Sequence, residues 1–96
     1  MPGVARKADI CSGHDLCPPR ANTSWSPDVF VNGRNVHRQG DAWAVHGCVD
    51  HAPHPSVLSS GSSTVIVNNK QCGRCGDPVA CGSSVATCSS NVIAGG

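Results

Sequence analysis

The sequence predicts a small all-β domain assembled from repeated short β-hairpins. Three observations lead to this prediction: one residue pattern recurs along the chain, no stretch shows the 3.6-residue apolar spacing of a helix, and large apolar side chains are scarce. The 96 residues include one Phe, two Trp, one Met and no Tyr, while Gly, Pro, Ser and Asn are abundant. We therefore expect a single domain over residues 1–96, with no extension.

The repeat is clearest between residues 26–33 (Ser-Pro-Asp-Val-Phe-Val-Asn-Gly) and 62–69 (Ser-Ser-Thr-Val-Ile-Val-Asn-Asn). The match continues without a gap, so that Arg-Gln-Gly-Asp at 38–41 corresponds to Arg-Cys-Gly-Asp at 74–77. A third, shorter copy occupies residues 89–95 (Ser-Ser-Asn-Val-Ile-Ala-Gly). An ordered set of matches at fixed spacing indicates a structural repeat.

Each copy contains a β-branched or aromatic run that predicts a strand leading into a hairpin turn. Asn32-Gly33 is the strongest turn signal, because both central residues of a type I′ turn need a positive φ. Asn68-Asn69 holds the same place in the second copy. Gly40-Asp41 and Gly76-Asp77 then mark a second turn after a short return strand. We expect His37, in the first return strand, to lie at the surface.

Composition and charge exclude several function classes. The net charge is +1 and the Lys and Arg residues are scattered, so no basic stripe for nucleic acid is present. No apolar stretch approaches the roughly 20 residues of a membrane span, and the N-terminus lacks the apolar segment of a signal peptide. Without a signal peptide, the seven Cys favour reduced thiols or metal ligation over a disulfide framework.

His and Cys residues gather in the loops between the copies. They are Cys11, His14, His46, Cys48, His51, His54 and Cys81. A closed zinc site needs four such ligands and can contribute on the order of 10–16 kcal/mol to the free energy of folding. A small core with few large apolar side chains needs an additional source of stability of this kind. Spacing alone does not select the four. Cys72-x-x-Cys75 has no partner pair, so we expect both, like Cys11, Cys17, Cys48 and Cys88, to pack as small apolar groups.

Taken in order, these motifs resemble the PAAR-repeat family over nearly the whole chain. The matching features are Gly13-His14 with Pro18-Pro19-Arg20, residues 28–33 leading to Arg38-x-Gly-Asp41, His46, His54-Pro55 before residues 60–65, Gly76-Asp77 with Cys81-Gly82, and residues 89–95. The segment that names the family, Pro-Ala-Ala-Arg, is replaced by Asn-Val-His-Arg at 35–38 and by Gln-Cys-Gly-Arg at 71–74. Each replacement keeps the Arg, and a Gly-Asp pair follows.

The resemblance implies a small conical fold of three β layers with one structural zinc near the apex, held by three His and one Cys. Carried over position by position, the ligands are His14, His46, His54 and Cys81. His51 and Cys48 are the alternative ligands, and iron is the alternative metal. The valines of the three runs are expected to divide between the core and the base of the cone; they are Val29, Val31, Val65, Val67 and Val92.

The function that the resemblance implies is structural. The chain would be the membrane-piercing tip that caps the trimeric β-helical central spike of a contractile injection machine. One copy would dock per trimer through the cone base, touching the target membrane transiently and binding no nucleic acid. A phage tail baseplate is the favoured setting, because residues 13–20 resemble short phage homologues, and the VgrG spike of type VI secretion is the alternative. The protein would be made in the bacterial cytoplasm and assembled at the tip of the virion tail spike or secretion spike.

Two further function classes stay open as alternatives. A Cys-rich zinc-binding interaction module would use Cys72, Cys75, Cys81 and Cys88 as an all-thiolate site, although nucleic-acid binders of this kind need aromatic and basic residues that are scarce here. A metallohydrolase would need an open zinc position and a carboxylate base. The chain has no Glu, and Asp15 and Asp50 are expected in turns. We therefore expect no enzymatic activity.

Overall fold

The structure, a computed structural model, describes the backbone of residues 2–13, 18–48 and 51–96, and the side chains of these ranges except 45–48 and 51–55. These residues form three two-stranded antiparallel sheets and no helix, which confirms the all-β prediction. The sheets pair β1 (Phe30–Val31) with β2 (Arg34–Asn35), β3 (Ala42–Cys48) with β4 (His51–Val57), and β5 (Ile66–Val67) with β6 (Lys70–Gln71). A helix long and apolar enough to cross a bilayer is accordingly absent from the described ranges.

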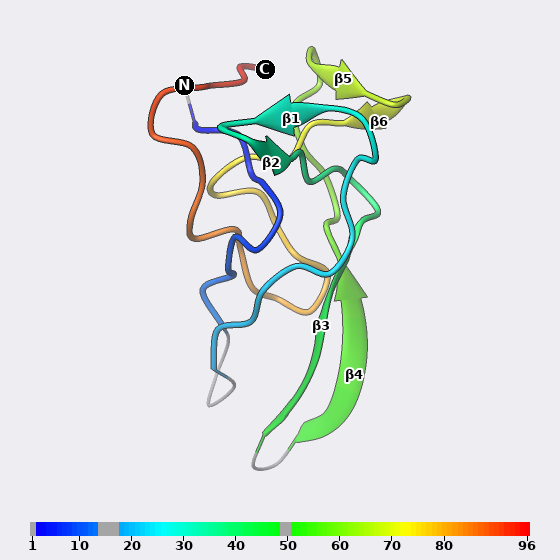
Figure 1. Cartoon of the computed structure of the whole chain (residues 1–96). Coiled ribbons are helices and arrows are strands. Elements are labelled where there is room, and N and C mark those ends of the chain that lie inside the picture. The colour runs from blue at the N-terminus through cyan, green and yellow to red at the C-terminus, as the bar shows by residue number, and fades with distance from the viewer. Residues whose placement is uncertain (1, 14–17, 49–50) are drawn as a thin grey trace.

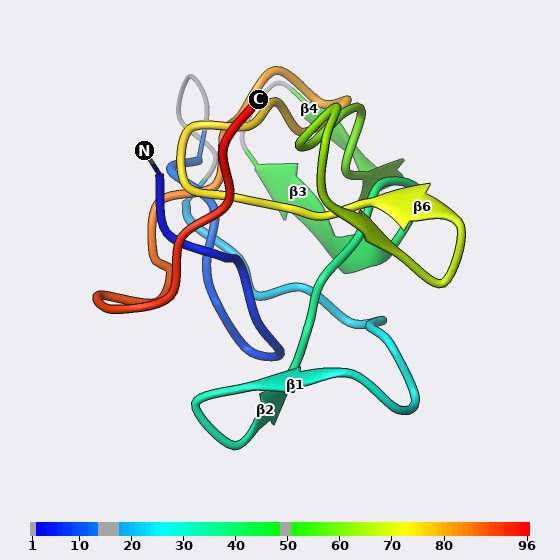
Figure 2. The ribbon, with the colours of Figure 1, turned by 90° about the horizontal axis from the view of Figure 1, so that it is seen from above.

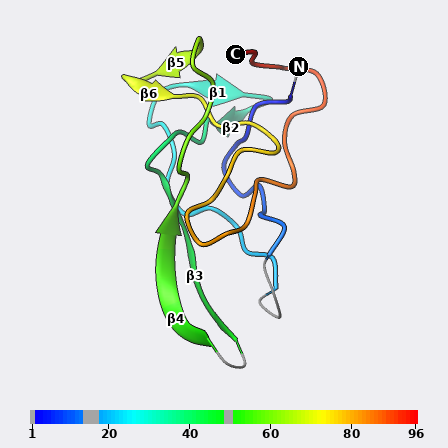
Figure 3. The same cartoon turned by 180° about the vertical axis from the view of Figure 1, so that it is seen from behind.

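The molecule is elongated, with principal extents of 37 × 24 × 22 Å. Its wide end carries β1, β2, β5, β6 and both chain ends, and the β3–β4 hairpin projects from the opposite end (Figures 1 and 3). We call the wide end the base, and the hairpin end the apex.

The two predicted hairpin turns are confirmed. Asn32 and Gly33 have φ values of 55° and 74°, and Asn68 and Asn69 have φ values of 53° and 65°. Both central positions of each turn are therefore left-handed, as a type I′ turn requires. The turns join β1 to β2 and β5 to β6 in registers that pair Val31 with Arg34 and Val67 with Lys70.

The third copy differs from the prediction, because its partner strand comes from the other end of the chain. Residues 89–94 pair with residues 2–4 instead of turning back on themselves, and Gly3 forms an antiparallel bridge with Ile93. The predicted hairpin at 92–95 is therefore wrong. We define unit 1 as residues 26–41, unit 2 as residues 62–77, and unit 3 as residues 89–96 together with 2–9. One backbone hydrogen bond of 2.9 Å recurs in all three: Val36 N to Val29 O, Cys72 N to Val65 O, and Val4 N to Val92 O.

The three units meet around a closed ring of backbone hydrogen bonds. Ala5 N donates to Gly73 O (2.8 Å), Gly73 N to His37 O (2.9 Å) and His37 N to Ala5 O (3.0 Å). Each residue donates to one neighbour and accepts from the other, so the ring defines an approximate threefold axis. Seen from above, the β1–β2 hairpin, the β5–β6 hairpin and the chain ends surround one centre (Figure 2).

An Arg and an Asp three residues later close the second turn of every unit. The pairs are Arg38–Asp41, Arg74–Asp77 and Arg6–Asp9. In each, the Arg backbone N–H and guanidinium both donate to the Asp carboxylate. The residue before the Asp has a positive φ: Gly40 (85°), Gly76 (88°) and Ala8 (71°). The guanidinium also reaches the next unit, from Arg38 to Asn68, Arg74 to Gly95, and Arg6 to Asn32.

The core consists of two small clusters. One lies within the base and contains Val4, Val36, Val67, Cys72 and Ala94; the other lies toward the apex and contains Ala5, Cys11, Trp43, Leu58, Val79 and Val85. The valines divide as expected: Val67 is buried and Val29 and Val31 are half-buried, whereas Val65 and Val92 are exposed.

His37 is fully buried, so the prediction of a surface position is wrong. It occupies the axial position that Ala5 and Gly73 hold in the other units, and a side chain at this position has to enter the interior. Its Nδ1 lies 2.9 Å from the Ser24 carbonyl, and its ring packs edge-on against Trp43 with 5.0 Å between centroids.

Candidate functional site

The apex brings together residues that the sequence analysis assigned to the metal site. His46 of β3 and His54 of β4 are direct partners across the hairpin. The alternative ligands Cys48 and His51 form the next pair toward the hairpin tip. Register shifts lie on both sides of the His46–His54 pair. Such irregularities re-aim side chains and are over-represented near functional sites in sheets.

Cys81 lies in a loop that is attached to β4. Its backbone N–H donates to the Ser56 hydroxyl (2.9 Å), and the Ala80 N–H donates to the Val57 carbonyl (2.9 Å). Ser56 stands only two residues after His54 on β4. Cys81 itself is a half-buried free thiol, so the loop holds an available sulfur ligand beside the strand that carries His54.

The segment that leads to the fourth predicted ligand runs beside the same loop. Ser12 N donates to Ser84 O (2.8 Å), and the Ser12 and Ser83 hydroxyls lie 3.1 Å apart. His14 itself falls outside the described residues. The described side chains contain no group of three or more His, Cys, Asp or Glu that could hold a metal. The structure thus brings three chain segments together at the apex: the β3–β4 hairpin, the loop of Cys81, and the segment that leads to His14. The set of four ligands stays a prediction.

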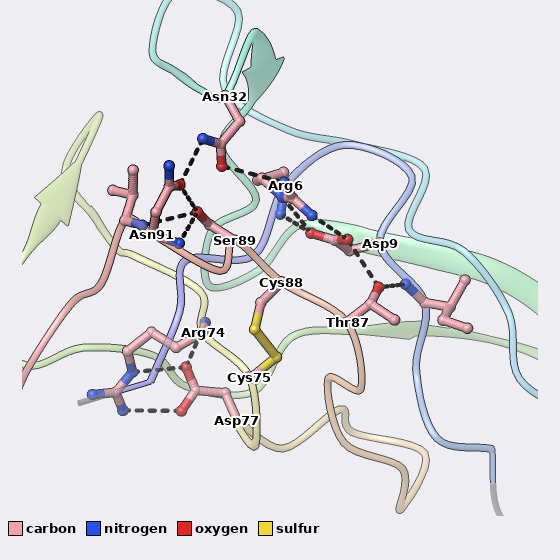
Figure 4. Close-up of a disulfide and its surroundings, with 12 residues drawn as sticks. Arg6, Asp9, Asn32, Arg74, Cys75, Asp77, Thr87, Cys88, Ser89 and Asn91 are labelled. Carbon is pink, nitrogen blue, oxygen red and sulfur yellow. Dashed lines mark hydrogen bonds and ion pairs between the residues drawn. A yellow bond between two sulfur atoms is a disulfide. The ribbon is translucent and has the colours of Figure 1, made fainter.

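The cysteines of the base differ from the sequence expectation. Cys75 and Cys88 form a disulfide with 5.6 Å between their Cα atoms (Figure 4), so the expectation that both pack as reduced, small apolar groups is wrong. The sequence argument rested on compartment, whereas the fold places these two residues side by side at a contact between units. The all-thiolate site of the alternative interaction module loses two of its four ligands to this bond.

Cys11 and Cys72 are buried free thiols that pack in the two core clusters, as expected. Burial raises the pKa of Cys72 to about 11, against the opposing charge of Arg74. Because the thiolate is the reactive and metal-binding form, Cys72 acts as an apolar core residue at neutral pH.

The base presents three exposed apolar side chains at equivalent positions of the three units. Phe30, Ile66 and Ile93 are 57%, 54% and 54% exposed. Each is the central residue of its apolar run, flanked by the valines that divide between core and surface. A chain with so few large apolar side chains places three of them in solvent on one end of the molecule, which is typical of an interaction surface. The sequence analysis considered only the valines, although the central position of each run distinguishes these three residues.

The sequence analysis also missed the second half of unit 3. Arg6 and Asp9 have the Arg-x-x-Asp spacing of 38–41 and 74–77, but Ala8 replaces the Gly that makes this motif recognisable. The segment Pro2-Gly-Val-Ala-Arg6 is also closer to Pro-Ala-Ala-Arg than the segments at 35–38 and 71–74. The Arg–Asp spacing was therefore the signal that could have identified it.

Comparisons with known proteins agree with this architecture. The family model described as PAAR motif matches residues 10–87. Two curated proteins of Pseudomonas aeruginosa are each 35% identical over 74 residues: the NAD(P)(+) glycohydrolase toxin Tse6 of strain PAO1 and the (p)ppApp synthetase toxin Tas1 of strain UCBPP-PA14. Each alignment covers 72% of this chain and 17% of the relative, so the chain spans only a small part of their length.

The family match, the repeated hairpins and the narrow end opposite a broad base therefore agree, and the chain belongs to the PAAR motif family, whose members are spike tips of contractile injection systems.

Proposed function

We propose that this chain caps a type VI secretion spike, with its base docked on the end of a trimeric β-helical spike protein and its apex leading into the target membrane. The observation that carries the proposal is the array of Phe30, Ile66 and Ile93 around an approximate threefold axis. A monomer with three similar faces can present one to each chain of a symmetric trimer. This geometry supports a stoichiometry of one copy per trimer.

The energetics of the base favour such a partner. Burying a Phe or Ile side chain fully stabilises by roughly 1.5–3 kcal/mol, so three exposed residues of this kind represent a considerable docking energy. They project from short two-stranded hairpins, and strands of this kind can pair with another chain along an uncovered edge. A β-helix presents strand edges and apolar side chains at its end and would cover both.

The relatives favour a bacterial secretion machine over the phage baseplate that the sequence analysis preferred. Both are named as toxins of Pseudomonas aeruginosa, and the chain matches a small part of each. Their toxin activities belong to those proteins. For this chain we propose the structural role alone, with no catalytic step.

The chemistry of the apex residues supports a zinc ion as the bound metal. His and Cys are the side chains that zinc prefers, and a site with four protein ligands leaves no open position for water or substrate. The backbones of His46 and His54 are paired in the register of the hairpin, and the loop that holds the free thiol of Cys81 is hydrogen-bonded to β4. With His14 as the fourth ligand, bound zinc would join three chain segments and stiffen the apex, and His51 and Cys48 are the alternatives.

The proposal is tested by mixing the purified protein with the β-helical spike protein encoded beside it and measuring the mass of the complex by light scattering. We expect one copy per spike trimer, and one zinc per chain by elemental analysis. Ile66→Asp and Ile93→Asp should each abolish the complex. Ile10→Asp, which introduces the same charge at an apolar residue of 39% exposure outside the base, should leave it intact.

Three copies per trimer would contradict the single-cap geometry. Unchanged binding by both base variants would show that the apolar array is not the docking face. For the metal, Cys81→Ser and His54→Ala should each lower the zinc content, whereas retention of a full equivalent by both would exclude the proposed ligand set.

A further inference from the structure

Three equivalent contacts join the units, and each uses a different chemistry. In each contact, the residue that follows the paired Arg of one unit touches the segment that precedes the next unit. Lys7 lies 4.8 Å over the Trp25 ring, Gln39 donates to the Ser59 carbonyl at 3.2 Å, and Cys75 is bonded to Cys88. The backbones agree: Lys7 N donates to Asn35 O, Gln39 N to Gln71 O, and Cys75 N to Gly3 O. The covalent contact is thus found at one of three otherwise equivalent places.

That place joins the unit whose two halves come from separate parts of the chain. Units 1 and 2 are continuous through their hairpin turns, but unit 3 joins two separate ends of the chain. Its C-terminal half also has little apolar anchorage. Ala94 stands where the other units have Val31 and Val67, and Val92 and Ile93 are exposed. Because apolar stabilisation scales with buried area, this segment is held mainly by hydrogen bonds.

Several of those hydrogen bonds use exposed side chains, among them the bonds from Asn32 to Asn91, from Ser63 to Gly96 and from Thr64 to Gly95. Ser89 N donates to Val4 O at 2.9 Å and Ala94 N to Pro2 O at 3.1 Å. The Gly95 carbonyl accepts from Arg74 and from Ser62, and the Asn91 side chain accepts from Asn32. Segments with few buried apolar contacts and exposed hydrogen bonds open locally at low free-energy cost. The disulfide fixes this segment at Cys88, its first residue (Figure 4).

The two bonded cysteines are more exposed than the neighbouring core thiol. Cys75 and Cys88 are half-buried, whereas Cys72, three residues before Cys75, is buried in the core and does not compete for pairing. Disulfides persist in oxidising compartments and are reduced in the cytosol. A bond at this position is therefore able to change with compartment while the core thiols stay reduced.

We propose that the Cys75–Cys88 disulfide is a redox-dependent lock on residues 88–96, the segment that carries Ile93 and completes the third face of the base. The chemistry is thiol–disulfide exchange with a small disulfide such as glutathione disulfide. The Cys75 and Cys88 thiols lose two protons and two electrons as their S–S bond forms, and the glutathione S–S bond breaks to give two glutathione thiols. In the reduced state, the segment opens locally and the base keeps two formed faces. The effect on docking rests on the proposed function, but the local opening does not.

Hydrogen exchange on the full chain as purified tests the lock. We compare the wild type with Cys75→Ser, Cys88→Ser and the double variant, all without reductant. Exchange of the Val92 and Ala94 amides should become at least tenfold faster in every variant, equally in the singles and the double, because each change breaks the same bond. The Val36 and Cys72 amides, in the two continuous units, serve as internal controls and should change little.

Unchanged exchange at Val92 and Ala94 would overturn the lock, and so would equal acceleration at Val36 and Cys72, which would make the bond a general stabiliser. If the variants do not fold, the same amides are followed in the wild type equilibrated in glutathione buffers of graded redox ratio. Protection should then rise together with disulfide content measured by mass, and protection independent of that content would exclude the proposal. An absent complex with the spike protein in both redox states would refute the docking function alone.

Discussion

The base and the apex are built in opposite ways. The base repeats one local pattern three times: an apolar run, a return segment that pairs with it, and an Arg–Asp pair that closes a turn. A tight turn joins the run to the return segment in units 1 and 2 only. The apex is made once, from a long hairpin and two loops that lie far apart in the sequence. The base therefore derives its order from redundancy and local hydrogen bonds, whereas the apex depends on segments that need a common anchor.

This difference predicts that the two ends respond separately to perturbation. Changes to one unit of the base should be shared by its neighbours, because each Arg also donates a hydrogen bond to the next unit. Changes at the apex should remove its anchor at once. The predictions below test that separation, in order of decreasing effect.

Metal removal should have the largest effect and should act on the apex first. We expect a strong chelator at neutral pH to lower the melting temperature by roughly 10 °C or more, since a bound metal stabilises the folded state by mass action. Hydrogen exchange should show lost protection at β3 and β4 and retained protection at the Ala5, His37 and Gly73 amides of the axial ring.

A chain that melts at the same temperature with and without chelator would contradict the metal-anchored apex. Equal loss of protection in the axial ring would instead mean that base and apex unfold as one cooperative unit and do not respond separately.

The base was the more predictable end, for a physical reason. The Asn-Gly turn and the Arg-x-Gly-Asp spacing are local signals, so the hairpins of units 1 and 2 could be read from the residues. Unit 3 was half recognised, because its halves are separated by almost the whole chain and Ala8 obscures the second turn.

The apex could be predicted only through family resemblance. Spacing proposed several His and Cys ligands but could not select among them, since the register that pairs His46 with His54 depends on two irregularities in the hairpin. The disulfide was missed for a related reason: the contact of Cys75 with Cys88 arises from unit packing, which spacing does not encode.

Breaking one Arg–Asp pair should have the next largest effect. Asp41 is buried, and although burial alone raises the pKa of this carboxyl, hydrogen bonds from the Arg38 side chain and backbone hold it below its usual value. Asp41→Asn leaves the buried Arg38 charge without its partner, which costs about 3–5 kcal/mol in comparable pairs. Denaturant unfolding measures the loss. The comparison is Asp28→Asn at an exposed position, where the carboxylate accepts hydrogen bonds from Ser26 and Asn68 and we expect a smaller loss of about 0.5–1.5 kcal/mol.

A cost below about 1 kcal/mol for Asp41→Asn would show that the pair is screened like a surface salt bridge. The three units would then be held by their backbone ring, with the Arg–Asp pairs contributing little.

His37 should make the base sensitive to acid. Burial lowers the pKa of His37, and the positive charge of Arg38 lowers it further. The hydrogen bond to the Ser24 carbonyl and the negative charges of Asp41 and Asp9 act in the opposite direction but do not outweigh burial. Below the ordinary His pKa of 6.5, the unfolded chain binds a proton that the folded chain does not. Stability should therefore be complete above that value and fall as the pH drops toward about 5, by at most about 1.4 kcal/mol per pH unit.

The comparison is between the wild type and His37→Ala, which places the residue of unit 3 at the equivalent axial position. Acid also protonates the proposed metal ligands, and both proteins share that effect, so the difference between their unfolding curves isolates His37. Parallel curves across this pH range would mean that His37 keeps an ordinary pKa.

The smallest effect should come from making unit 3 more like its neighbours. Ala8 has a φ of 71° where units 1 and 2 have Gly40 and Gly76, and its side chain is exposed, so Ala8→Gly removes strain without opening a cavity. The left-handed conformation destabilises an L-residue by roughly 1–2 kcal/mol, and Gly relieves this strain. The greater conformational freedom of Gly in the unfolded chain offsets about 0.5–1 kcal/mol of the gain. We expect a net gain of about 0.5–1 kcal/mol in denaturant unfolding. The control is Ala86→Gly, at an exposed position without a positive φ, which should lower the free energy of unfolding by about 0.5–1 kcal/mol. A lower free energy of unfolding in both variants would mean that the turn of unit 3 carries no strain that glycine relieves.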